Sequence, residues 1–346
     1  MPSLLRYALP LVVCLSPLAA AAQTAAQAGA PADGPRAELF APGVVSTAAN
    51  ETSASFSADG RTVYFMRGDY ASADTTILMA QRNGQGWGRV RTAPFSGRWR
   101  DSEPHLTPDG RRLYFISNRP PASGAAPVTV VRGGQSFPGA NLWYVDARAD
   151  GSWGEPVHID GEINRLATVY NPSQAANGNL YFSAVREDSG GVNQLYLARR
   201  EGQGFAAPQR LDIGVGVKAN RMDPAIDPHE RFIVFAGNEG DSRGAADIYI
   251  AFRAADGGWG KPIALPGEVN SVWLENAPTL GRGFGELYVT SMRPQTVEFP
   301  KRGDDPAAIA RRIATPLNGS RNLWRFDIAA LLRAHGVEEA PAAAQR

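Results

Sequence analysis

Thr107-Pro108-Asp109-Gly110, followed closely by Leu113-Tyr114-Phe115, is the clearest copy of a phrase that this chain repeats. The phrase is a turn rich in Asp and Gly that leads into an aromatic strand. The other copies pair residues 57–60 with 63–65, 177–178 with 180–182, 227–230 with 233–235, and 281–283 with 287–289. The middle residues of the five triplets are 50, 67, 53 and 54 residues apart. Such a period indicates one repeated supersecondary unit, because each unit needs its neighbours to bury its faces.

Each unit is expected to supply four short strands. The first precedes the turn, and the second is the aromatic triplet. The third is aliphatic and aromatic, at residues 77–80, 142–145, 195–198, 248–251 and 323–326. The fourth follows a glycine turn with an aromatic side chain, at Trp87, Trp153, Phe205 and Trp259. Strong β-formers with turns at this spacing favour blades around an axis, so we expect an all-β fold, a five-bladed β-propeller with four strands in each blade.

The way the ring closes is predicted from a fourth strand that is missing in the last unit. The fourth-strand phrase follows units one to four but not unit five, and residues 38–45 carry its Pro-plus-aliphatic pattern ahead of unit one. An N-terminal strand that completes the last blade removes an exposed sheet edge. We therefore expect a strand within residues 38–46 to pair beside residues 322–327.

The segments outside the repeats suggest export. Residues 1–22 read as a secretory signal peptide, with Arg6, an apolar stretch at 9–18 and small residues at 20–22. Lipidation at Cys14 is an alternative, although Val13 stands where a lipobox has a small residue. Residues 23–36 read as a flexible spacer, 37–330 as one propeller domain, and 331–346 as a short C-terminal helix and tail. We expect a periplasmic or secreted protein.

Charge and hydropathy exclude some partners. The 35 basic and 34 acidic residues give a formal net charge of +1, without a basic run. Non-specific nucleic-acid binding is therefore not indicated. No segment after the signal peptide is long and apolar enough to predict a transmembrane helix. We expect a monomer whose partner is an envelope protein, a peptide or a glycan.

The phrase Pro108-Asp109-Gly110-x-x-Leu113-Tyr114-Phe115-x-Ser117-x-Arg119 resembles the repeats of TolB-type propellers, also called WD40-like Pro-Asp repeats. Weaker copies stand at Asp59 and Asp227. The resemblance covers residues 38–327 and implies the fold but says little about activity, because the motif builds blades. TolB itself has an α/β domain before the propeller, and this chain has the spacer there, so a role in the Tol-Pal envelope system is not implied.

Propeller topology assigns the loops to two faces. The connections into each first strand and those between second and third strands emerge on one face, and the Asp-Gly turns emerge on the other. Two second-to-third loops are long, at residues 118–140 and 292–321. Long loops are often functional, so this loop-rich face is the predicted site of function.

The same face is expected to gather charge from the segments that lead into the first strands. These residues are Glu51, Arg98, Arg100, Asp101, Glu103, Arg165, Lys218, Arg221, Asp223 and Glu275, with Trp99 and Trp273 among them. Carboxylates and arginines beside aromatic rings suit a sugar or a peptide. Alternatively, the charges pair with one another and tie the blades together.

The remaining candidates are weaker. His105 follows Glu103 by two residues, so the two side chains form a candidate acid–base pair, or His105 is a packed, hydrogen-bonded histidine. Scattered histidines make a zinc site improbable, and calcium held by axial carboxylates stays an alternative. No cofactor is indicated.

Two functions follow from these residues. The first is a non-enzymatic binding or scaffold protein that recognises a peptide, protein or glycan on the loop-rich face. The second is a carbohydrate-active hydrolase or lyase, for which Glu103, Asp223 and Glu275 are the candidate catalytic residues. Fold alone does not decide between the two.

Overall fold

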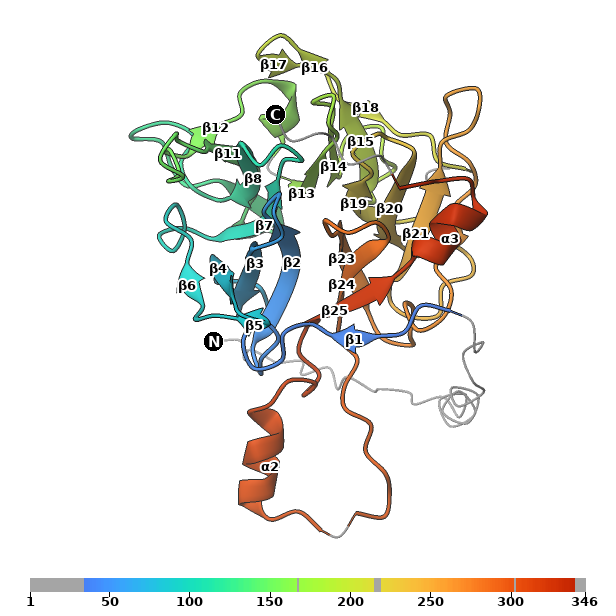
Figure 1. The fold of residues 1–346 in the computed structure, drawn as a ribbon. Helices are drawn as coiled ribbons and strands as arrows, with labels where there is room; N and C mark the ends of the chain where they lie inside the picture. The colour runs from blue at the N-terminus through green and yellow to red at the C-terminus, as the bar shows by residue number, and fades with distance from the viewer. Residues whose placement is uncertain (1–33, 167, 215–218, 302, 340–346) are drawn as a thin grey trace, which may run out of the picture.

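The computed structural model describes residues 34–166, 168–214, 219–301 and 303–339. These form five antiparallel sheets around one axis, as Figure 1 shows. These five sheets confirm the predicted five-bladed propeller. The expected signal peptide, most of the spacer and Lys218 lie outside the described residues.

The strands of each blade are given from the axis outward. The first blade holds β2 (Asn50–Phe56), β3 (Thr62–Gly68), β4 (Thr75–Asn83) and β6 (Arg91–Thr92), and the second holds β7 (Asp101–Leu106), β8 (Arg112–Ser117), β11 (Asn141–Asp146) and β12 (Val157–His158). The third holds β13 (Val169–Gln174), β14 (Leu180–Ala184), β15 (Gln194–Ala198) and β18 (Gln209–Arg210). The fourth holds β19 (Arg221–Ile226), β20 (Phe232–Gly237), β21 (Asp247–Phe252) and β22 (Ile263–Ala264). The fifth holds β23 (Glu275–Leu280), β24 (Glu286–Ser291), β25 (Asn322–Asp327) and β1 (Glu38–Leu39).

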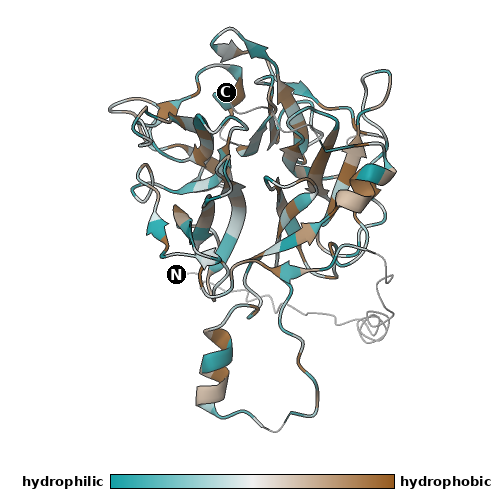
Figure 2. Ribbon diagram, in the orientation of Figure 1, coloured by the Kyte–Doolittle hydropathy of each residue, from teal (hydrophilic) through white to brown (hydrophobic). Residues whose placement is uncertain are grey.

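The repeated triplet makes the core between blades. In the second blade, Tyr114 packs toward the third blade, whereas Leu113 and Phe115 pack toward the first. This alternation follows from the two-residue period of a strand. Each of the five hydrophobic clusters lies between two neighbouring blades, and the brown segments in Figure 2 lie mainly on the blade strands.

The ring closes as predicted, with a shorter strand. In β1, Glu38 and Leu39 pair with Arg325 and Trp324 of β25, and the Phe40 N–H donates to the Leu323 carbonyl at 2.8 Å. The rest of residues 40–46 forms turns and isolated bridges instead of continuing the strand.

The fourth strands begin later than predicted. The aromatic phrases at Trp87 and Phe205 lie in β5 (Gly86–Trp87) and β17 (Gly204–Phe205). β5 pairs with the end of β4, and β17 pairs with β16 (Arg200–Glu201) just after β15. Trp153 and Trp259 make antiparallel bridges of the same kind to Ala147 and Arg253. Each phrase therefore closes a hairpin on the third strand or its extension, and the outermost strand follows it.

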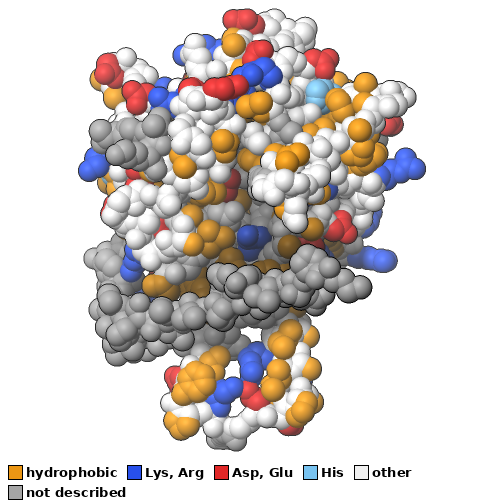
Figure 3. Space-filling model, turned by 180° about the vertical axis from the view of Figure 1, so that it is seen from behind, with side chains coloured by type: hydrophobic (Ala, Val, Ile, Leu, Met, Phe, Trp, Pro, Cys, Tyr) orange, Lys and Arg blue, Asp and Glu red, His pale blue; other side chains and the backbone are white. Residues whose placement is uncertain are grey.

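Both long loops contain secondary structure. Residues 118–140 carry the hairpin β9 (Thr129–Arg132) and β10 (Gln135–Pro138), and 292–321 carry α2 (Pro306–Ile313). Figure 1 shows α2 on an arm that projects away from the ring, and Figure 3 shows hydrophobic and basic side chains mixed on it. Two shorter helices are η1 (Glu162–Arg165) and α3 (Ala329–Ala334). None of the helices in the described ranges is long and apolar enough to cross a membrane.

Candidate functional site

Five equivalent residues of the inner strands surround the axis. They are Ser53, Glu103, Asn171, Asp223 and Ala277, with φ angles between 45° and 57°. Each lies at a β-bulge of its inner strand. Positive φ is uncommon for residues other than glycine, and bulges re-aim side chains. We call these five residues the axial ring.

Hydrogen bonds link members of the axial ring across the blades. The backbone N–H of Asn171 donates to Glu103 Oε2 at 2.6 Å, and its side-chain Nδ2 donates to Asp223 Oδ1 at 2.6 Å. The N–H of Ala277 donates to Asp223 Oδ2 at 2.9 Å. Asn171 therefore bridges the two carboxyl groups, and both oxygens of Asp223 are occupied. Among the described residues, no group donates to Glu103 Oε1.

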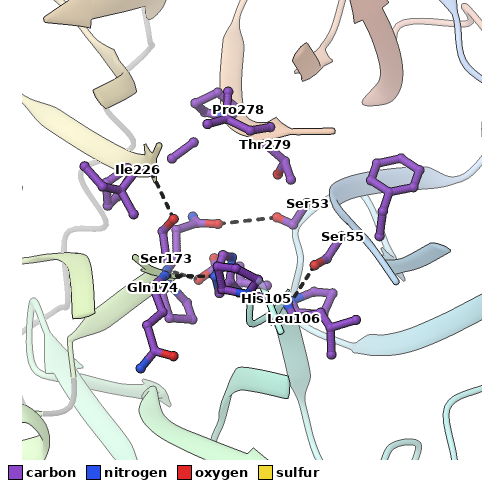
Figure 4. A pocket seen from close by; sticks show the side chains of 18 of the residues that line it. Ser53, Ser55, His105, Leu106, Ser173, Gln174, Ile226, Pro278 and Thr279 are labelled. Carbon is purple, nitrogen blue, oxygen red and sulfur yellow. Dashed lines mark hydrogen bonds between the residues drawn. The ribbon is translucent and has the colours of Figure 1, made fainter. Parts of the chain in front are cut away.

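A small cavity of about 70 Å³ lies on the turn side of the axial ring, and Figure 4 shows its lining. His105 lies here, where its Nε2 accepts the Gln174 N–H at 2.8 Å. Arg282 also lines this cavity, and its Nε donates to the Phe56 carbonyl at 2.9 Å. The Arg282 guanidinium thus joins the last blade to the first on the turn side of the axis.

A larger cavity of about 780 Å³ opens on the loop-rich side of the axial ring. We call it the axial cavity. Its floor includes Glu103, Asn171 and Asp223, and its wall is built by loops from several blades. The wall residues that matter below are Ser72, Arg100, Phe137, Tyr170, Asn193, Asn276 and Arg321.

Burial changes the acidity of the two carboxyl groups. Burial, the larger cause, and the negative charge of Asp223 together raise the pKa of Glu103 to about 8, against the hydrogen bond from Asn171 and the positive charge of Arg100. The pKa of Asp223 is also raised by burial, against hydrogen bonds from Ala277 and Asn171. Glu103 therefore holds its proton at neutral pH more readily than an exposed glutamate does.

Most of the other predicted charges form ion pairs. Asp101 pairs with Arg119 at 2.6 Å, and Glu275 pairs with Arg293 at 3.2 Å. In both blades the arginine ends a Ser-x-Arg phrase, and its Nε donates to that serine. The remaining pairs are Glu51 with Arg67, Arg221 with Glu239, and Arg165 with Glu162 and Glu187. These residues therefore follow the alternative interpretation, in which charged side chains of this face form ion pairs.

Of the predicted site residues, the axial cavity brings together Arg100, Glu103 and Asp223. Trp99 is 37% exposed and lines a shallower neighbouring hollow, and Trp273 is 48% exposed and lies away from both cavities at the axis. His105 makes no hydrogen bond to Glu103, and burial together with the charge of Arg282 lowers its pKa to about 3. The structure places His105 as a packed, hydrogen-bonded histidine.

Several cavity residues were missed from the sequence, namely Ser72, Phe137, Tyr170, Asn171, Asn193, Asn276 and Arg321. One signal could have identified part of the axial ring. Its members Glu103, Asn171, Asp223 and Ala277 each precede a proline, and they stand 11, 10, 11 and 11 residues before the middle of the triplet. Arg321 ends a long loop and carries no such signal.

The described residues contain no group of three or more His, Cys, Asp or Glu side chains placed to hold a metal ion. The lining of the axial cavity offers acidic, amide and guanidinium groups for binding.

Comparisons with known proteins give fold-level likeness only. No family model and no curated protein matches this chain. A protein of unknown function from Dyadobacter fermentans is 14% identical, with a TM-score of 0.46 over 85% of this chain and 98% of that chain. An alpha-L-arabinofuranosidase from Lactobacillus brevis is 13% identical, with a TM-score of 0.47 over 82% and 97% of the two chains. A thermostable family-43 glycoside hydrolase is 9% identical, with a TM-score of 0.46 over 80% and 88%. Similarity at this level assigns no activity to this chain.

Proposed function

We propose that this chain is an exported, TolB-type propeller that binds a sugar unit of a glycan in its axial cavity. One observation carries the proposal: Arg100, Arg321 and Glu103 line one cavity without ion pairs to each other or to the rest of the described chain. Glu51, Asp101, Arg165, Arg221 and Glu275 on the same face are all paired. Charged groups left with free hydrogen-bonding positions in a cavity are the usual basis of ligand recognition.

The wall of the axial cavity also contains polar atoms without partners. The side-chain oxygens of Asn193 and Asn276 and the Nε of Arg321 are buried and form no hydrogen bond among the described residues. Leaving such an atom unsatisfied costs about 1–3 kcal/mol. A polar ligand, or water in its absence, would offset that cost after small side-chain rotations.

A sugar suits this wall better than a peptide does. Each sugar hydroxyl both donates and accepts, which matches guanidinium donors interleaved with amide and carboxyl acceptors. Tyr170 and Phe137 add aromatic surface for an apolar sugar face. The volume of about 780 Å³ lies within the range of small-ligand sites, roughly 300–1,000 Å³.

A glycan array with purified protein tests the proposal. Glu103→Gln should bind the array ligand at least about tenfold more weakly or with altered selectivity, because the protonated carboxyl can both donate and accept at its open Oε1, whereas the amide oxygen of glutamine only accepts. Glu339→Gln is the matched control, since Glu339 is exposed and lines a cavity on the opposite face. Equal loss in both variants, or in neither, would argue against the axial cavity as the site.

Glycoside hydrolysis is the second candidate, and the acidity of Glu103 favours it. A carboxylic acid with a raised pKa beside a second carboxylate is the usual arrangement for general-acid catalysis at a glycosidic bond. Reducing-sugar release from the bound glycan measures this directly. Turnover that is lost in Glu103→Gln while binding is retained would favour the enzyme, and binding without turnover in the wild type would favour the binding protein.

A further inference from the structure

Two arginines at the axial cavity donate hydrogen bonds to the same serine. Arg100, which precedes β7, donates from Nε to the backbone carbonyl of Ser72 at 2.9 Å. Arg321, which precedes β25, donates from Nη1 to the hydroxyl of the same serine at 3.2 Å. The second and fifth blades thus present their guanidinium groups on either side of the loop between β3 and β4.

The serine itself is fixed in an unusual conformation. Ser72 has a φ of 55°, and its N–H donates to the Asp69 carbonyl at 3.0 Å. The neighbouring Ala73 N–H donates to Asp69 Oδ1 at 2.7 Å. Because left-handed backbone is uncommon for serine, the loop holds its carbonyl and hydroxyl toward the two arginines at some conformational cost.

The two guanidinium groups differ from four other arginines near the ends of the blade strands on this face. Arg67, Arg119, Arg221 and Arg293 each pair with a carboxylate. Within the described ranges, Arg100 and Arg321 pair with none, and Arg321 Nε has no acceptor at all. Guanidinium groups held in place with free N–H groups are suited to a planar anion, which they bind through paired hydrogen bonds.

The net charge of the axial cavity also favours an anionic ligand. Arg100 and Arg321 contribute two positive charges, and Asp223, whose pKa is raised by burial, contributes no more than one negative charge. The raised pKa of Glu103, about 8, keeps this fourth group largely neutral at pH 7. An anionic group of the ligand is therefore favoured near the arginines. The hydroxyl groups of the same sugar would face the amide and carboxyl groups of the cavity floor.

We propose that Arg100 and Arg321, positioned by Ser72, hold the carboxylate of an acidic sugar in the axial cavity. This inference rests on the proposed function and narrows its ligand to glycans that contain uronic acid. The carboxylate accepts N–H groups from both guanidinium groups, and the sugar ring lies toward Glu103 and Asn276.

The experiment compares uronic-acid oligosaccharides with their carboxyl-reduced counterparts on one array. The wild-type protein should bind at least one acidic oligosaccharide, and carboxyl reduction should weaken that binding at least tenfold. Arg100→Gln and Arg321→Gln should each lose the preference for the acid, and Arg321→Lys should keep only part of it because lysine lacks the planar fork. Circular dichroism melting verifies that each variant is folded.

Arg61→Gln is the matched control, because Arg61 is exposed beside the Asp-Gly turn of the first blade, on the face opposite the axial cavity. It should bind as the wild type does. Equal binding of acidic and reduced sugars would overturn the carboxylate inference and leave the glycan proposal standing. Failure to bind any array glycan, acidic or neutral, would contradict both.

Discussion

Replacing Phe40 with alanine tests how strongly the N-terminal segment closes the ring. Phe40 is 7% exposed, and its ring lies 5.8 Å from Phe56, 5.6 Å from Trp87 and 4.9 Å from Tyr288, measured between centroids. The first two partners belong to blade one and the third to blade five. One side chain from the N-terminal segment therefore packs against both blades where the ring closes.

The expected loss of unfolding free energy is about 3–5 kcal/mol, the usual cost of Phe→Ala in a core. The three edge-on ring contacts favour the upper part of this range, since aromatic pairs add about 0.5–1.5 kcal/mol beyond area burial. Glu38→Ala is the control. Glu38 pairs with Arg325 at 3.0 Å on the surface, and such pairs contribute about 0–1 kcal/mol.

Urea unfolding followed by tryptophan fluorescence measures both variants, and the m-value should change little if the ring stays a single cooperative unit. A loss below about 1 kcal/mol for Phe40→Ala, equal to that of Glu38→Ala, would refute the closure by residues 38–40.

Three further predictions concern individual side chains. Asp109→Ala should lose about 0.5–1.5 kcal/mol of stability, because Oδ1 accepts the Thr107 hydroxyl at 2.6 Å and the Arg111 N–H at 3.1 Å. Glycan binding by this variant should stay unchanged. Weakened binding at full stability would mean that the two faces are assigned in reverse. Glu103 has a pKa raised from 4.5 to about 8, so the folded chain holds a proton that the unfolded chain releases, and this group's contribution lowers stability as pH rises through that interval. Glu103→Gln should therefore flatten the fall in melting temperature between pH 5 and about 8.5, and an unchanged slope would speak against the raised pKa. His105 has a pKa lowered from 6.5 to about 3, so the unfolded chain binds the extra proton and stability falls as pH drops through that interval. His105→Gln should unfold less steeply in acid, and an identical acid limb would be inconsistent with a buried neutral histidine.

The blade core was predictable because it depends on local patterning. Leu113, Tyr114 and Phe115 alternate between two neighbouring clusters, and the turn before them repeats the same polar contacts. At Asp59, Oδ1 accepts the Ser57 hydroxyl at 2.6 Å, as Asp109 does from Thr107. Periodicity and turn chemistry are encoded within a few residues, so a single sequence reveals them. The fourth strands were predicted too early in the chain, because an aromatic residue after a glycine turn is equally compatible with a hairpin on the third strand.

The site was only partly predictable because its residues meet across the ring. Glu103 and Asp223 were candidates from their positions in the chain, but the bulges that turn them toward the axis depend on the whole inner strand. Arg321 reaches the cavity from the end of a long loop and is fixed by Ser72, about 250 residues earlier in the chain. The ion pairs could not be read from the sequence either, since Asp101 and its partner Arg119 stand 18 residues apart, in β7 and in the loop after β8.

A crystal structure of the protein with the glycan selected on the array tests the central claim most directly. We expect density for one sugar unit in the axial cavity, with a hydroxyl within hydrogen-bond distance of Glu103 Oε1. Density instead on the opposite face, beside Arg231 and Phe284, would contradict it.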